Sequence, residues 1–122
     1  MAKSKISWLK NSESHDYAAA EEYLTLLMPP SAAKVLVRRL RRSTLRQFKA
    51  KDVFRASTLP LLGTDSWHVQ KDRAKIQKRK KLSPLLLVRG KPPAHLTIAD
   101  GYHRLCAVYS FDEDAVIPCK IV

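Results

Sequence analysis

Glycine, cysteine and long apolar runs are scarce in this chain of 122 residues, which has three glycines and two cysteines. A membrane-spanning helix needs about 20 consecutive apolar residues, and no stretch of the sequence approaches that length. Residues 1–8 also lack the apolar segment of a signal peptide. These absences predict a cytoplasmic protein with no membrane partner.

The two cysteines, Cys106 and Cys119, form neither a Cys-x-x-Cys motif nor a His/Cys cluster with the spacing of a zinc site. In a reducing cytosol two such residues are expected as buried free thiols. The sequence therefore argues against a structural zinc site and against a disulfide-stabilised fold.

Acidic residues are also few: there are 11 Asp and Glu against 23 Lys and Arg, which gives a net charge of +12. Residues 82–122 hold four of each sign, so the whole excess lies in residues 1–81. Such an excess favours polyanionic partners, above all nucleic acid, although a basic face can also serve only to keep a protein soluble. The candidate nucleic-acid-binding residues are Arg38, Arg39, Arg41, Arg42, Lys75, Lys78 and Arg79.

Length and composition fit one globular domain, because 45% of the residues are hydrophobic and 28% are charged. Within residues 1–45, a loose arm with Trp8 and Leu9 docked is expected to precede a helical hairpin. Asp16 can cap a first helix that ends near Met28, and Ser31 can cap a second helix over residues 32–42. Two helices and a short turn also fit a helix-turn-helix, but the acidic first helix favours a hairpin that caps the sheet.

Residues 46–122 have the pattern of a mixed α and β segment. Residues 51–57 are a candidate short helix, and residues 67–81 a basic helix with Trp67 in the core. The continuous apolar run 84–88 predicts a central strand buried on both faces. Two further strands are expected at residues 96–98 and 116–122, the last of them at a sheet edge or with a bulge because it contains Pro118. The predicted fold is α+β: a small mixed sheet with packed helices, preceded by the N-terminal hairpin.

The sequence is organised around residues 96–107, which change from strand-like alternation to a helical period at Asp100-Gly101. This pattern predicts a strand, a tight glycine turn and a helix. His103 and Arg104 then lie in the first turn of the helix, where free N–H groups and the macrodipole attract anions. Arg104 needs a compensating negative charge there, which either a bound phosphate or the acidic loop 112–114 can supply.

The run Asp100-Gly101-Tyr102-His103-Arg104, with Ala107 after it, resembles the signature turn of the ParB/sulfiredoxin-like superfamily. The resemblance extends back through residues 82–88 and forward to residues 116–122. It also implies a first strand, for which residues 46–49 are the candidate. Tyr102 stands where sulfiredoxins have their reactive cysteine, so reduction of sulfinic acids is not expected. The form Asp-Gly-x-His-Arg is more similar to ParB-like free-serine kinases, although Tyr102 departs from their usual histidine.

The resemblance implies a ParB-like domain that binds a nucleotide or another phosphate ligand, and it could act as a small phosphotransferase or nucleotidase. The implied cofactor is a nucleoside triphosphate or diphosphate with Mg²⁺. Asp100 would either hold Mg²⁺ or act as base, and Asp52 is the candidate for an additional acidic base from an earlier segment. The implied phosphate ligands are Gly101, Tyr102, His103 and Arg104, and the implied catalytic residues are Asp100 and His103. The alternative function is a nucleic-acid-binding module that uses the basic N-terminal two thirds.

Overall fold

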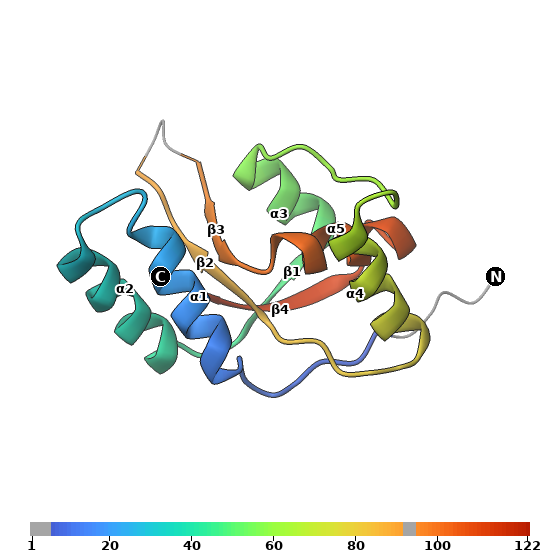
Figure 1. Cartoon of the computed structure of the whole chain (residues 1–122), viewed down its shortest axis with the longest axis horizontal. Coiled ribbons are helices and arrows are strands. Elements are labelled where there is room, and N and C mark those ends of the chain that lie inside the picture. The colour runs from blue at the N-terminus through green and yellow to red at the C-terminus, as the bar shows by residue number, and fades with distance from the viewer. Residues whose placement is uncertain (1–5, 92–94) are drawn as a thin grey trace.

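The computed structural model describes residues 6–91 and 95–122, which form a mixed four-stranded sheet with helices on both faces (Figure 1). The strand order is β1-β4-β2-β3. The α+β class predicted from the sequence is therefore confirmed. The strands are β1 (Arg46–Lys49), β2 (Leu85–Val88), β3 (Thr97–Asp100) and β4 (Val116–Ile121), and the helices are α1 (Ser14–Leu24), α2 (Pro30–Arg42), α3 (Ala50–Ser57), α4 (Trp67–Gln77) and α5 (Tyr102–Phe111).

Strand β2 lies inside the sheet, parallel to β4 and antiparallel to β3. Its four residues are all buried, as the continuous apolar run predicted. Leu85 and Leu87 contribute to a core shared with α3, α4 and α5, whereas Leu86 and Val88 contribute to a second core shared with α1 and α2. Because side chains alternate along a strand, the two groups of helices cover opposite faces of the sheet.

Strand β4 is also central, between β1 and β2, so the prediction that Pro118 marks an edge or a bulge was wrong. The antiparallel register with β1 runs without a shift past Gln47 and Pro118. The pairing with β2 begins only at Cys119, one residue after the proline. The N–H group that proline lacks is therefore not needed on the side of β2.

Helices α1 and α2 form the expected hairpin, but both begin at other residues than the sequence suggested. The N-cap of α1 is Glu13, and Asp16 lies three residues later, where its Oδ2 accepts a hydrogen bond of 3.0 Å from the backbone N–H of Glu13. The helix ends at Leu24, before a turn that leads to Pro29. The first residue of α2 is Pro30, whose fixed φ and missing N–H suit that position better than a cap at Ser31.

Helix α4 differs from its prediction in its end and in its buried face. It ends at Gln77, because the chain turns through Arg79 in a left-handed conformation instead of continuing to Lys81. Val69 and Ile76 are buried, but Trp67 is 65% exposed, so its placement in the core was wrong. Trp67 precedes Val69 by two residues and so projects about 200° around the helix from it.

The segment before α1 docks beside the chain that leads into β2, as expected for Trp8 and Leu9. Trp8 forms a parallel bridge with Leu82, and the N–H of Leu9 donates to the Leu82 carbonyl at 2.8 Å. Cys106 and Cys119 are free and buried, as predicted. Over residues 6–91 and 95–122, none of the helices has both the length and the apolar character needed to cross a membrane.

Candidate functional site

The turn between β3 and α5 has the strand, glycine and helix order predicted from the sequence. Asp100 ends β3, and Gly101 is the N-cap of α5 with φ 108° and ψ 14°. This left-handed conformation is one that other residues rarely adopt. A Cβ atom at Gly101 would also lie 2.8 Å from Cγ of Leu85 and 3.0 Å from Nη2 of Arg104. Both conformation and space therefore require glycine here.

The N-terminus of α5 has no side-chain cap, because Gly101 has no side chain. The first N–H group bonded to the helix backbone is that of Leu105, which donates to the Gly101 carbonyl at 2.9 Å. The N–H groups of Tyr102, His103 and Arg104 have no hydrogen-bond partner within the described part of the chain. Three unpaired donors and the positive end of the helix dipole therefore meet at one place.

Arg104 is held by three hydrogen bonds. Its Nη2 lies 2.8 Å from Oδ2 of Asp100, its Nε donates to the Ser83 carbonyl at 3.0 Å, and Nη2 also donates to the Pro84 carbonyl at 3.3 Å. Both members of the ion pair are largely buried, with 16% of the Arg104 side chain and 17% of the Asp100 side chain exposed. The compensating carboxylate for Arg104 is therefore Asp100, four residues earlier in the chain.

Asp100 also meets a second acid, Asp16 of α1, which is only 4% exposed. Burial raises the pKa of Asp100 above its ordinary value; the Arg104 guanidinium opposes the rise, and the charge and hydrogen bonding of Asp16 add to it. The pattern of residues around Asp16 predicted only a capping role for it. Nothing in the sequence could have shown that the first turn of α1 lies against the end of β3.

His103 packs against His68 of α4, with ring centroids 4.6 Å apart and an interplanar angle of 37°. Burial lowers the pKa of His103, His68 and Arg104 lower it further, and Asp72 opposes them. His68 is exposed, and the sequence did not indicate its contact with His103. The second neighbour of His103 is Tyr102, whose hydroxyl donates to the Pro60 carbonyl.

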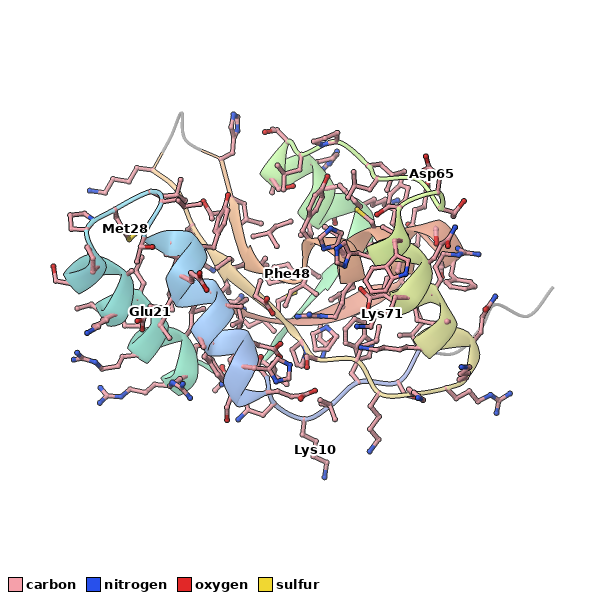
Figure 2. All side chains as sticks on the ribbon, viewed as in Figure 1. Lys10, Glu21, Met28, Phe48, Asp65 and Lys71 are labelled. Carbon is pink, nitrogen blue, oxygen red and sulfur yellow. The ribbon has the colours of Figure 1, made fainter. Side chains whose placement is uncertain are left out.

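These groups line an open pocket of about 160 Å³ between α4 and the N-terminus of α5. Lys71, which Figure 2 labels on α4, is one of its two lysines. The residues from α4 follow the i, i+3, i+4, i+7 spacing of one helix face, which is the signal that could have grouped them. The lining residues are His68, Lys71, Asp72 and Lys75 of α4 with Asp100, Gly101, Tyr102, His103 and Arg104.

Other candidate residues lie elsewhere. Asp52, the candidate additional base, lines a different pocket under α3 and has Arg55 Nη2 at 3.6 Å from its Oδ1. Among the described residues no group of three or more His, Cys, Asp or Glu could hold a metal ion.

The basic residues predicted to bind nucleic acid fall into two groups separated by the sheet. The arginines of α2 lie with α1 on one face, whereas α4 and the residues after it lie on the other (Figure 1). Lys75 belongs to the pocket beside α5, whereas Lys78 and Arg79 follow the end of α4. The two groups therefore belong to helices on opposite faces of the sheet. The first group is Arg38, Arg39, Arg41 and Arg42, and the second is Lys75, Lys78 and Arg79.

Comparison of the chain with protein-family models, with curated proteins and with solved structures finds no match. The ParB/sulfiredoxin-like resemblance therefore remains a prediction that rests on the five-residue turn and on the order of strands around it.

Proposed function

We propose that the pocket between α4 and the N-terminus of α5 binds a phosphate group of a small ligand such as a nucleotide. The observation that carries the proposal is the meeting of three unpaired backbone N–H groups with the cations of α4 at one pocket. Backbone donors at a helix N-terminus and nearby cationic side chains are the usual ligands of phosphate in proteins.

The charges of the pocket separate into paired and unpaired groups. Arg104 is paired with Asp100, and Lys75 has Asp72 as a distant partner at 3.9 Å. Lys71 has no carboxylate partner among the described residues, and its Nζ lies over the Trp67 ring. Lys71 is therefore the cation most available to a ligand, while Arg104 contributes its charge from a fixed position.

The pocket is large enough to enclose only part of a small-molecule ligand. Sites that enclose small molecules usually measure about 300–1,000 Å³, whereas this pocket measures about 160 Å³. It can hold a phosphate group, and the remainder of a nucleotide would lie outside it.

The same residues suggest a chemistry for phosphoryl transfer or phosphate hydrolysis. Burial, His68 and Arg104 lower the pKa of His103, and a lowered pKa favours the neutral imidazole that a general base requires. Asp100 is committed to Arg104 and is the poorer candidate for a base. A small phosphotransferase or nucleotidase would therefore use His103 for proton transfer, and Asp100 would be the residue to hold Mg²⁺, which would neutralise charge on the phosphates.

Binding of inorganic phosphate and tripolyphosphate, measured by calorimetry and by thermal unfolding with and without Mg²⁺, tests the proposal. A ligand at 100 times its Kd stabilises the fold by about 2.7 kcal/mol. We expect Lys71→Ala and His103→Asn to weaken binding several-fold. Lys78→Ala, which removes the same charge just beyond the end of α4, should bind as the unmodified chain does. Equal effects of Lys71→Ala and Lys78→Ala, or no binding at all, would contradict the proposal.

A second candidate function is nucleic-acid binding by the exposed cations of α2 and β1, which we call the α2–β1 surface. Neither element contains an acidic residue. Phosphate contacts of this kind supply most of the affinity of sequence-independent binding. The α2–β1 surface consists of Lys34, Arg38, Arg39, Arg41, Arg42 and Lys49.

A further inference from the structure

Trp67, the first residue of α4, is 65% exposed although tryptophan is the largest apolar side chain available to a core. Single exposed apolar residues are common on protein surfaces. The position of Trp67 sets it apart, because its neighbours on the helix are His68 and Lys71, and both line the phosphate pocket. The pocket therefore opens beside an aromatic surface that the described part of the fold leaves uncovered.

A row of rings connects this surface to the turn. The Trp67 and His68 ring centroids are 4.9 Å apart in an edge-to-face arrangement, and the His68 and His103 centroids are 4.6 Å apart. Trp67 is thus fixed relative to the unpaired N–H groups at the start of α5. A ligand whose phosphate binds at those groups would have its remaining part within reach of the indole.

Lys71 joins the two features directly. It lines the pocket, and its Nζ lies 5.5 Å from the centroid of the Trp67 ring. A cation over an exposed aromatic ring is held weakly, whereas an ammonium bonded to phosphate forms a stronger charge-assisted contact. When Lys71 turns to a phosphate it leaves the face of the indole open for another flat group.

We infer that the ligand of the pocket is a nucleotide whose base stacks on Trp67 while its phosphate binds at the N-terminus of α5. The inference rests on the proposed phosphate site and adds the side chain that contacts the base, the exposed Trp67. Stacking of bases on aromatic side chains tolerates every base, because each has a π face. The pocket is too small for a whole nucleotide, which agrees with a base placed outside it.

A neighbouring hollow offers the main alternative position for a base. It measures about 430 Å³, lies on the other side of the turn and is lined by Tyr23, Leu59 and the same residues 100–103. Within the described residues it has no lysine or arginine in its lining, so it lacks the link to the phosphate that Lys71 provides. Tyr23 therefore serves as the comparison in the test.

The experiment compares AMP and CMP with ribose 5-phosphate, which has the same phosphate and sugar but no base. Calorimetry gives the three Kd values, and Trp67 fluorescence is followed in a Trp8→Phe background, where it is the only tryptophan. We expect the nucleotides to bind about tenfold more tightly than ribose 5-phosphate, and to quench the fluorescence of Trp67. Trp67→Ala should remove the tenfold advantage and leave the affinity for ribose 5-phosphate unchanged.

Trp67→Phe should keep part of the advantage, and Tyr23→Ala should keep all of it. Equal binding of nucleotides and ribose 5-phosphate without quenching would overturn the stacking inference and leave the phosphate site in place. An advantage that survives Trp67→Ala but disappears in Tyr23→Ala would move the base to the other hollow and also overturn it. If ribose 5-phosphate, inorganic phosphate and the nucleotides all fail to bind, the proposed function falls together with the inference.

Discussion

Arg104 illustrates how one side chain can belong to both the fold and the pocket. A guanidinium in the first turn of a helix is unfavourable for the helix dipole, and the Asp100 carboxylate at 2.8 Å offsets this cost. Its bonds to the Ser83 and Pro84 carbonyls tie the start of α5 to the chain that enters β2. None of the three bonds uses Nη1, so that nitrogen is the atom of Arg104 that a phosphate could engage.

Replacing Arg104 by Ala should therefore destabilise the protein even without a ligand. The variant loses three hydrogen bonds and leaves Asp100 buried beside Asp16 without a counter-charge. We expect a loss of about 2–4 kcal/mol in the free energy of unfolding at pH 7, measured with urea. Adding Asp100→Asn should recover part of this loss, because no unpaired charge remains.

The loss should depend on pH. Because the folded-state pKa of Asp100 is raised, its neutral form stabilises the fold at acidic pH, and this contribution is lost as the pH rises through the folded-state pKa. Removing Arg104 raises that pKa further, so Arg104→Ala should cost more at pH 7 than at pH 4. An equal cost at both pH values would show that the ion pair adds nothing beyond its hydrogen bonds.

The sequence predicted the residues of the turn and missed those that face it. Gly101 and Arg104 were found because one short motif contains the strand end, the glycine and the helix start. His68, Lys71 and Asp16 come from elements that only tertiary packing brings to this turn, and a single sequence does not contain that information. Trp67 was predicted to lie in the core as one of the apolar positions of its helix, but the buried face is that of Val69 and Ile76.

At the scale of elements, the runs of apolar residues were more informative than the end signals. The apolar run 84–88 predicted the buried strand β2 directly, whereas the strand at residues 46–49 was expected from the superfamily resemblance. Helix ends depend on which residue reaches a free N–H group, and Glu13 does so together with Asp16 by forming a capping box. The central position of β4 was missed because it depends on the register of the assembled sheet. In that register β4 pairs with β2 only from Cys119 onward, so the missing N–H of Pro118 is not needed there.

Helix α2 gives a prediction at this scale for the nucleic-acid alternative. Arg38, Arg39 and Arg42 are exposed on it, whereas Arg41 packs over the Tyr17 ring at 4.3 Å and is best left unchanged. If the α2–β1 surface binds a nucleic-acid duplex, changing the three arginines to Gln should lower the affinity for that duplex. The slope of log K against log salt should fall by about 0.9 for each phosphate that the variant no longer neutralises.

Fluorescence anisotropy with a labelled duplex between about 50 and 200 mM KCl measures this slope. The matched control changes Lys78, Arg79 and Lys80 to Gln, which removes the same charge from the other side of the sheet. An equal drop in affinity in both triple variants would show that net charge alone attracts the duplex. Unaltered binding in the α2 variant would exclude the α2–β1 surface.

At the scale of the whole molecule, the net charge of +12 results from 23 Lys and Arg residues against 11 Asp and Glu residues. Like charges repel one another in the folded state, and added salt screens this repulsion. Any salt should therefore stabilise the protein to some extent. An anion that binds the pocket should stabilise it further, with a dependence that saturates at high concentration.

Sodium chloride and sodium sulfate at equal ionic strength separate the two effects. Screening raises the melting temperature in both salts. The exclusion of sulfate from protein surfaces raises it further, by an amount that does not saturate with concentration. We expect the unmodified chain and Lys78→Ala to show an additional, saturable rise of the melting temperature in sulfate. Lys71→Ala should lose that saturable rise and keep the stabilisation that comes from screening and from the exclusion of sulfate.

The saturable rise of the melting temperature in sulfate should become larger as the pH falls from about 7.5 to 5.5. Sulfate keeps its charge over this range, whereas His103 has a pKa below its ordinary 6.5 because of burial, His68 and Arg104. A bound dianion favours the protonated imidazole, so sulfate binding takes up a proton and tightens by at most tenfold per pH unit for each histidine. His103→Asn should bind sulfate with less dependence on pH. If sulfate stabilises the unmodified chain and Lys71→Ala equally at every concentration and pH, screening and exclusion account for all of it, and the pocket holds no anion.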